Sequence, residues 1–232
     1  MNMSYYIVLT IGLVVSLIFC IRRARGFSVS NLMFKSVSSL CYLLTGAFAL
    51  IENPYAGVYG SLIVFGGALG LVGDISLDLK GIYKKDESTY LRAGFIFFLI
   101  GHLFYSAAII YTTQLKIWQI LLCFGVSVAV SAVNTASAKI MKIHFGAYRK
   151  IVFFYVIFLA FTMILGIACA IIFKFQKKYV LLAVGAILFT LSDMVLSGTF
   201  FGRNKDGKFY LFINHFLYYA GQYLIASSVL FI

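Results

Sequence analysis

Residues 151–173 read IVFFYVIFLAFTMILGIACAIIF and contain no charged side chain. An α-helix rises about 1.5 Å per residue, so a helix of this length spans the hydrocarbon core of a bilayer, which is about 30 Å thick. Membrane β-barrels show a different pattern, with alternating segments of about ten residues. The stretch therefore predicts a transmembrane helix.

Similar apolar runs recur on both sides of this segment, along all 232 residues. The chain is 62% hydrophobic and 11% charged, against about 25% charged residues in an average soluble domain. This composition excludes a disordered chain and an ordinary soluble fold. We predict an all-α polytopic membrane protein that forms one domain over residues 1–232. The eight predicted transmembrane helices cover residues 4–21, 31–51, 57–79, 93–111, 117–138, 151–173, 179–201 and 209–232.

The basic residues are divided unevenly between the two ends of these spans. One end holds fifteen of the nineteen Lys and Arg residues, and the other holds Lys116, Lys174, Lys177 and Lys178. Cytoplasmic ends of membrane helices are enriched in Lys and Arg, so both termini are predicted to lie outside. We attribute the net charge of +12 to this topology and not to nucleic-acid binding. The expected location is a bacterial plasma membrane.

Cofactor and metal motifs are not evident in the sequence. Each of the four cysteines lies in an apolar run, without a CxxC pair or a histidine at ligand spacing. No nucleophile elbow, HExxH or Walker motif is present. We therefore expect no cofactor, no metal site and no disulfide. The cysteines are Cys20, Cys41, Cys123 and Cys169.

Polar residues within the spans are the strongest indication of function. A charge at mid-helix costs about 2.5–3.5 kcal/mol on insertion scales. Counting the helical rise places six polar residues about 6–20 Å from the inner end of their spans. They are Lys35, Asp74, His102, Asp193, Tyr218 and Gln222. This common level predicts a polar cavity that opens to the cytoplasmic side. Four further residues are expected near its rim, where Asp78 would be solvated: Asp78, Asn134, Asn214 and His215.

Two aspartates differ in their sequence surroundings. Asp74 is at a depth similar to that of Lys35 on the neighbouring span, so a purely structural ion pair remains an alternative there. Asp193 has no basic residue near it in its span, and its carboxyl is expected to hold a proton when buried. Carboxyls in contrasting environments commonly divide the roles of general acid and general base. Asp74 and Asp193 are therefore the candidate catalytic residues.

A weak internal repeat links the two halves of the chain. Asp74 is followed in the next span by His102 and Tyr105, and Asp193 is followed by His215 and Tyr218 in the same H-x-x-Y spacing. A displacement by four spans predicts two parallel four-helix halves. Chance similarity in an aromatic-rich chain is the alternative.

Five ordered motifs resemble the YhhN-like family of lysoplasmalogenases, from the second span to the eighth. They are Lys35, Gly73-Asp74-Ile75-Ser76-Leu77, Gly101-His102-Leu103-Phe104-Tyr105, Ser192-Asp193-Met194-Val195-Leu196 and Tyr218-Tyr219-Ala220-Gly221-Gln222. Family members often have proline after the lysine, where this chain has Ser36.

The resemblance implies an ether-bond hydrolase that cleaves the vinyl ether of a lysophospholipid into a fatty aldehyde and a glycerophospho-alcohol; another lysolipid remains open as the substrate. In this chemistry Asp193 is the expected acid and Asp74 the expected base, and the reverse assignment remains open. The expected substrate-binding or orienting residues are Lys35, His102, Tyr105, Asn134, Tyr218 and Gln222.

Two other classes of function remain open at this stage. An intramembrane set of Asp, His and Lys residues also fits a proton-coupled transporter of a lipid or small molecule. A non-catalytic lipid-binding protein would use the same aspartates only to hold its helices together.

Overall fold

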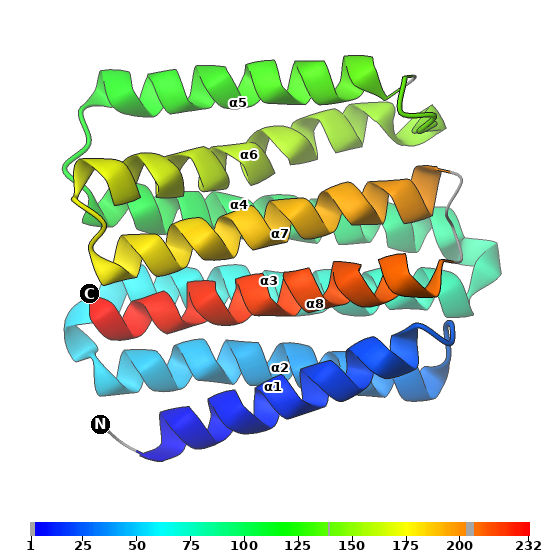
Figure 1. Cartoon of the computed structure of the whole chain (residues 1–232), viewed down its shortest axis with the longest axis horizontal. Helices are drawn as coiled ribbons and strands as arrows, with labels where there is room; N and C mark the ends of the chain where they lie inside the picture. Colours follow the sequence, from blue (N-terminus) through cyan, green and yellow to red (C-terminus); the bar gives the residue numbers. More distant parts are fainter. Residues whose placement is uncertain (1–2, 139, 203–206) are drawn as a thin grey trace.

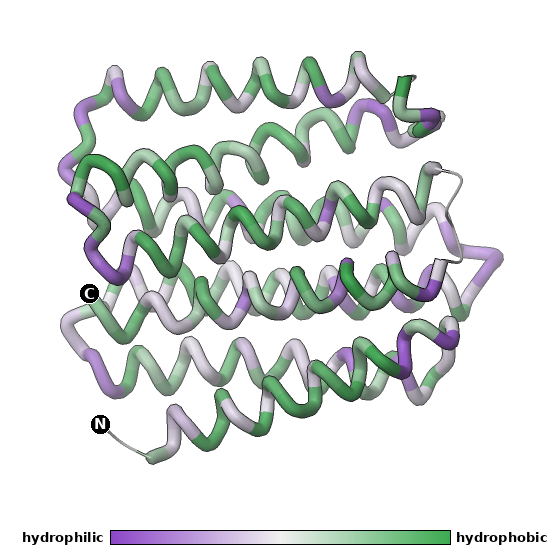
Figure 2. Tube along the Cα trace, viewed as in Figure 1, coloured by the Kyte–Doolittle hydropathy of each residue, from purple (hydrophilic) through white to green (hydrophobic). Residues whose placement is uncertain are grey.

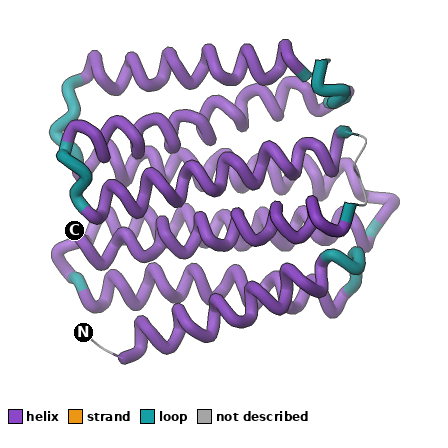
Figure 3. The backbone as a smooth tube through the Cα atoms, in the orientation of Figure 1, coloured by secondary structure: helices purple, strands orange, loops and turns teal. Residues whose placement is uncertain are grey.

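The computed structural model describes residues 3–138, 140–202 and 207–232. These residues form long helices joined by short turns, and no strand occurs among them (Figures 1 and 3). The prediction of an all-α chain is therefore confirmed. The helices are α1 (Met3–Arg23), α2 (Val29–Glu52), α3 (Gly57–Ile82), α4 (Glu87–Thr112), α5 (Ile117–Ser137), α6 (Arg149–Ile172), α7 (Lys177–Phe201) and α8 (Lys208–Ser227).

The helix boundaries depart from the prediction at two places. α4 begins at Glu87, six residues before the expected start. Polar residues at 87–89 lower the local hydropathy, yet an acidic residue in the first turn suits the positive end of the helix dipole. α8 ends at Ser227, and the chain continues as a 3-10 turn over Ser228–Phe231.

Seven of the eight described helices, α1 to α7, are long and apolar enough to cross a membrane. Figure 2 shows hydrophobic residues along most of each helix and hydrophilic residues concentrated at many helix ends. The protein is therefore a polytopic membrane protein. α8 does not meet the same limits of length and hydropathy, so seven of the eight predicted spans are supported.

The basic turns and the chain ends lie at opposite ends of the bundle. The turns that follow α1, α3 and α5 gather on the right in Figure 1, whereas Met3 and Ile232 lie on the left. Three of the fifteen basic residues assigned to the cytoplasmic end, Lys139, Arg203 and Lys205, lie outside the described residues.

The helix pairing repeats after four helices. α3 packs extensively on α4, as α7 does on α8, and α1 packs on α2, as α5 does on α6. Between these groups, α2 contacts α8 and α6 contacts α4. This pattern is what two related four-helix halves would produce.

Glycines allow the closest helix contacts. A Cβ atom added to Gly66 of α3 would lie 3.0 Å from the Gly101 carbonyl oxygen of α4. A Cβ atom added to Gly221 of α8 would lie 2.7 Å from the Gly185 carbonyl oxygen of α7. Small residues permit such backbone contacts between membrane helices. Asp74 lies eight residues after Gly66, and Asp193 lies eight residues after Gly185. These contacts therefore help to fix the positions of both aspartates.

Replacement of Gly221 by alanine tests the α7–α8 contact. We expect Gly221→Ala to destabilise the protein by about 1–3 kcal/mol, because the backbone of α7 must move away from the new methyl group. Gly125→Ala is the matched control, since a Cβ atom there meets nothing within 4 Å. Thermal unfolding in detergent measures both variants, and equal stability of the two would contradict the packing described.

Candidate functional site

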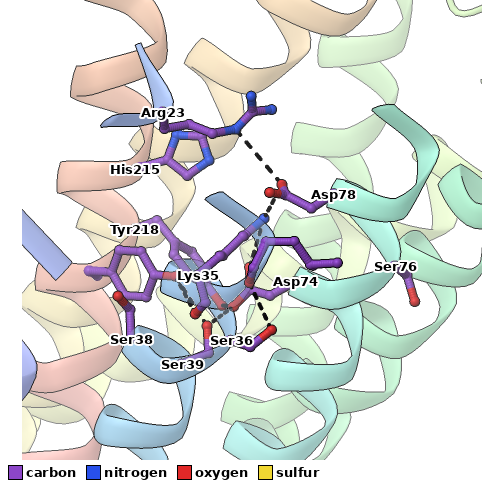
Figure 4. A network of polar contacts seen from close by, with 12 residues as sticks. Arg23, Lys35, Ser36, Ser38, Ser39, Asp74, Ser76, Asp78, His215 and Tyr218 are labelled. Atoms are coloured by element: carbon purple, nitrogen blue, oxygen red, sulfur yellow. Dashed lines mark hydrogen bonds and ion pairs between the residues drawn. The ribbon is translucent and has the colours of Figure 1, made fainter. Parts of the chain in front are cut away.

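A buried ion network joins three helices near the basic end of the bundle (Figure 4). Lys35 of α2 places its Nζ 3.1 Å from Asp78 Oδ1 and 3.3 Å from Asp74 Oδ1, both on α3. Arg23 of α1 places its Nε 3.8 Å from the same Asp78 oxygen. Asp74 and Asp78 are one helical turn apart and so present both carboxyls to α2.

Three expected rim residues are in fact covered: Asp78, Asn214 and His215. The prediction that Asp78 is solvated is wrong, because its side chain is only 2% exposed and lies between Lys35 and Arg23. His215 is likewise buried, and its ring packs edge to face on Phe19 of α1 at 5.1 Å between centroids. The reason is that α1 packs on both α2 and α8 and closes this part of the rim.

Asp74 is surrounded by groups that favour its carboxylate. Ser39 Oγ and Tyr218 OH both donate hydrogen bonds to Asp74 Oδ2, at 2.7 Å and 2.6 Å. Lys35 pairs with the other carboxylate oxygen. Hydrogen-bond donors and a neighbouring cation both stabilise the charged form of a carboxyl.

Tyr218 connects Asp74 to two further predicted site residues. Gln222 Nε2 donates to the Tyr218 hydroxyl at 3.2 Å, and the Tyr105 hydroxyl donates to Gln222 Oε1 at 2.8 Å. Tyr105, Tyr218 and Gln222 therefore form one hydrogen-bonded chain that ends on Asp74.

Asp193 of α7 lies in a contrasting environment. The hydroxyl of Tyr155 on α6 donates a hydrogen bond to its Oδ2, and the Ser192 side chain is a second hydrogen-bond partner. None of the ion pairs found among the described residues includes Asp193. The sequence analysis did not identify Tyr155. Its only signal there was a hydroxyl group in an almost wholly apolar span.

The two aspartates line one small cavity of about 40 Å³. A cavity needs only about 10–15 Å³ and polar partners to hold a water molecule, so this cavity has room for at least one water beside the two carboxyls. Lys35, Arg23 and Tyr218 line the same cavity.

A larger apolar groove of about 430 Å³ adjoins the cavity. Its walls come mainly from α5, α6 and α7, and the residues include Val130, Val133 and Met163. Asp193 and Tyr155 line both the groove and the small cavity. A groove of this size is within the range of ligand pockets, about 300–1,000 Å³.

Four predicted site residues do not line the cavity: His102, Tyr105, Asn134 and Gln222. Tyr105 and Gln222 are connected to Asp74 through Tyr218. His102 is buried and lines neither the cavity nor the groove; its Nδ1 lies 3.3 Å from Thr162 Oγ1 on α6. Its side chain is directed to α6 instead. Asn134 lines the apolar groove with Asp193 and not the cavity that holds Asp74.

The described residues contain no group of three or more His, Cys, Asp or Glu side chains that could hold a metal ion. The four cysteines are buried with free thiols. The cavity is lined by the carboxyls of Asp74, Asp78 and Asp193, by the side chains of Lys35 and Arg23, and by Tyr155 and Tyr218.

Comparison with known proteins places this geometry in a family. The YhhN family model matches residues 30–229, which include both aspartates and all of the helices from α2 to α8 except the first residue of α2. Searches of curated proteins and of solved structures give no match. The match covers most of the chain, and the protein therefore belongs to the YhhN family.

Proposed function

We propose that this protein hydrolyses the vinyl ether bond of a lysophospholipid to a fatty aldehyde and a glycerophospho-alcohol. One observation carries the proposal. Asp74, held by a cation, and Asp193, which has none, line the same cavity, and Asp193 also lines the apolar groove. Family membership supports this assignment.

The groove provides the place for the hydrocarbon chain. A lysophospholipid chain in the groove ends beside Asp193, where the double bond meets the small polar cavity. Because the groove lies between α5, α6 and α7, substrate enters sideways from the membrane. The groove residues Val130 and Val133 are 40% and 66% exposed, which is consistent with an opening on this side.

Asp193 acts as the acid. The Tyr155 hydroxyl occupies Oδ2, which leaves Oδ1 to carry the proton. Asp193 gives this proton to the alkene carbon that is not bonded to the ether oxygen, and the electron pair of the double bond forms the new C–H bond. The product is an oxocarbenium ion, and the negative charge on Asp74 stabilises it.

Asp74 acts as the base. It removes a proton from the water in the cavity as the water oxygen adds to the oxocarbenium carbon, giving a hemiacetal. The hemiacetal then loses its hydroxyl proton to Asp193 while Asp74 returns a proton to the departing glycerol oxygen. Both aspartates regain their starting states, and the net reaction consumes one water.

Carboxamide replacement of either aspartate tests the two roles. Asp193→Asn and Asp74→Asn are each expected to lower aldehyde release by at least about 10²–10⁴-fold, because an amide neither supplies a carboxylic proton nor carries negative charge. Asp86→Asn, at an exposed aspartate in the α3–α4 turn, is the control and is expected to keep full activity. Mass spectrometry of products from a vinyl ether lysophospholipid measures all three.

A double variant separates chemistry from helix pairing. Lys35→Met with Asp74→Asn removes one charge of each sign, and Asp78 retains Arg23 as its partner. We expect this variant to be more stable than Lys35→Met, which leaves Asp74 without a cation at a cost of about 3–5 kcal/mol. It is expected to stay inactive. Recovery of turnover together with stability would show that Asp74 only pairs helices.

A matched pair of valines tests the groove. Val130 lines the groove and Val184 does not, although their side chains are 40% and 41% exposed. Val130→Phe is expected to lower kcat/KM for an 18-carbon chain roughly tenfold, which equals the loss of about two buried methylene groups. A 10-carbon substrate should be affected less, and Val184→Phe should change neither. The same effect from both variants would exclude the groove as the chain site.

We also propose that α8 is an eighth membrane span in a single domain and that both termini lie outside. α8 runs beside α7 (Figure 1). Its polar residues Asn214, His215 and Gln222 are buried against other helices and are not turned to lipid. The basic end of the bundle then faces the cytoplasm, and the cavity opens toward that side.

Reporter fusions after Ile232 test this orientation. Alkaline phosphatase, which is active outside the cytoplasm, is expected to be active there, and a green fluorescent protein is expected to be dark. The opposite pair of results would invert the topology.

A further inference from the structure

Arg23 has a buried guanidinium group that the network around Asp78 does not satisfy. The residue is 2% exposed. Its Nε lies 3.8 Å from Asp78 Oδ1, beyond hydrogen-bond distance, and neither Nε nor Nη1 has a hydrogen-bond partner. The Phe27 ring lies 3.5 Å from Cζ and covers one face of the group. A buried charged donor without an acceptor is costly, so this arrangement calls for a ligand that accepts hydrogen bonds.

The guanidinium group lines the cavity that contains the two aspartates. In Figure 4 its terminal nitrogens point away from Asp78, and His215 lies beside it. The unpartnered donors therefore lie on the side of the guanidinium group away from Asp78, and a ligand would reach them through the cavity that Arg23 lines.

The charges around Arg23 favour an anion. Lys84 lies on the same Phe27 ring, with Nζ 5.8 Å from its centroid. Lys80 places its Nζ 3.5 Å from the ring of Phe200, a residue that lines the cavity. Among the described residues, the ion-pair partner of Lys80 is Glu87, which is 4.0 Å away and half exposed. The cavity also contains the carboxyls of Asp74, Asp78 and Asp193, so the excess of positive charge is local to Arg23, Lys80 and Lys84. A local excess of one sign of charge attracts ligands of the other sign.

The spacing along α3 fits a glycerophospholipid. Asp78, which neighbours Arg23, is one helical turn or about 6 Å from Asp74. In a lysophospholipid, three glycerol carbons and one ester oxygen separate the ether oxygen from phosphorus, a length of about 6 Å with single bonds near 1.5 Å. With the ether bond at Asp74 and Asp193, the phosphate therefore reaches the level of Arg23.

We propose that Arg23 binds the phosphate group of the substrate and makes the site specific for phosphate-bearing lysolipids. This inference rests on the proposed function. Arginine presents paired donors suited to phosphate oxygens. Arg23 precedes the first residue of the family match, residue 30, so the family relationship does not assign it this role.

The test measures binding without turnover. An alkyl lysophospholipid, whose saturated ether is not cleaved by this chemistry, is compared with the alkylglycerol of the same chain length, by calorimetry in detergent. We expect Arg23→Gln to weaken binding of the alkyl lysophospholipid about 10- to 100-fold, the effect of losing a charged hydrogen bond. Alkylglycerol affinity should change by less than about twofold.

The control is Arg25→Gln, an exposed arginine in the same turn, which is expected to leave both affinities unchanged. If Arg23→Gln unfolds, Arg23→Gln with Asp78→Asn removes both charges and is expected to fold with the same selective loss. Equal weakening of both ligands, or of neither, would overturn the proposal.

Two further results separate this inference from its alternatives. Inorganic phosphate should compete with the alkyl lysophospholipid only weakly, because it lacks the chain that lies in the groove. If phosphate competes at equal concentration, the site takes free phosphate, and the lipid assignment is overturned. A selective loss of binding in a protein that releases no aldehyde would uphold Arg23 as the phosphate residue and refute the proposed hydrolysis.

Discussion

The placement of Lys35 between two aspartates is the interaction on which the site depends. Its ammonium group lies 3.3 Å from Asp74 and 3.1 Å from Asp78, with almost no access to solvent. Charges buried at this depth persist only when paired, and removal of one partner leaves another uncompensated. The pairing therefore fixes α2 against α3 and favours the carboxylate form of Asp74. No such cation pairs with Asp193 among the described residues, so the same network makes the two carboxyls of the cavity unequal.

Hydrolysis of a vinyl ether requires two carboxyls that differ in this way. Protonation at carbon needs an acid that keeps its proton, and addition of water needs a nearby base. Asp193 lies where the apolar groove meets the small polar cavity, and Asp74 lies on the polar side with Lys35, Ser39 and Tyr218. In the proposed reaction the hydrocarbon chain and the water lie on opposite sides of the two carboxyls, in the apolar groove and in the small polar cavity of about 40 Å³.

The sequence predicted the helices well, because apolar runs of membrane-spanning length are visible in the sequence itself. It did not predict direction around each helix axis. His102 contacts Thr162 on α6, and Asn134 lines the groove instead of the cavity. The cover provided by α1 was also missed, since nothing in a span's own sequence shows which neighbours it packs on; this is why Asp78 was expected to be solvated. Tyr155 had no signal beyond a single hydroxyl in an apolar span, although it donates to Asp193.

Isotope labelling of the products tests the central claim most directly. Purified protein is incubated with a vinyl ether lysophospholipid, once in D₂O and once in H₂¹⁸O, and both products are analysed by mass spectrometry. Acid–base hydrolysis by the two aspartates predicts one deuterium on the carbon next to the aldehyde carbonyl, and no ¹⁸O in the glycerophospho-alcohol, because its oxygen comes from the substrate. It also predicts that Asp193→Asn forms neither product. Incorporation of ¹⁸O into the glycerol, an aldehyde without carbon-bound deuterium, or the absence of any aldehyde from the parent protein would contradict the account.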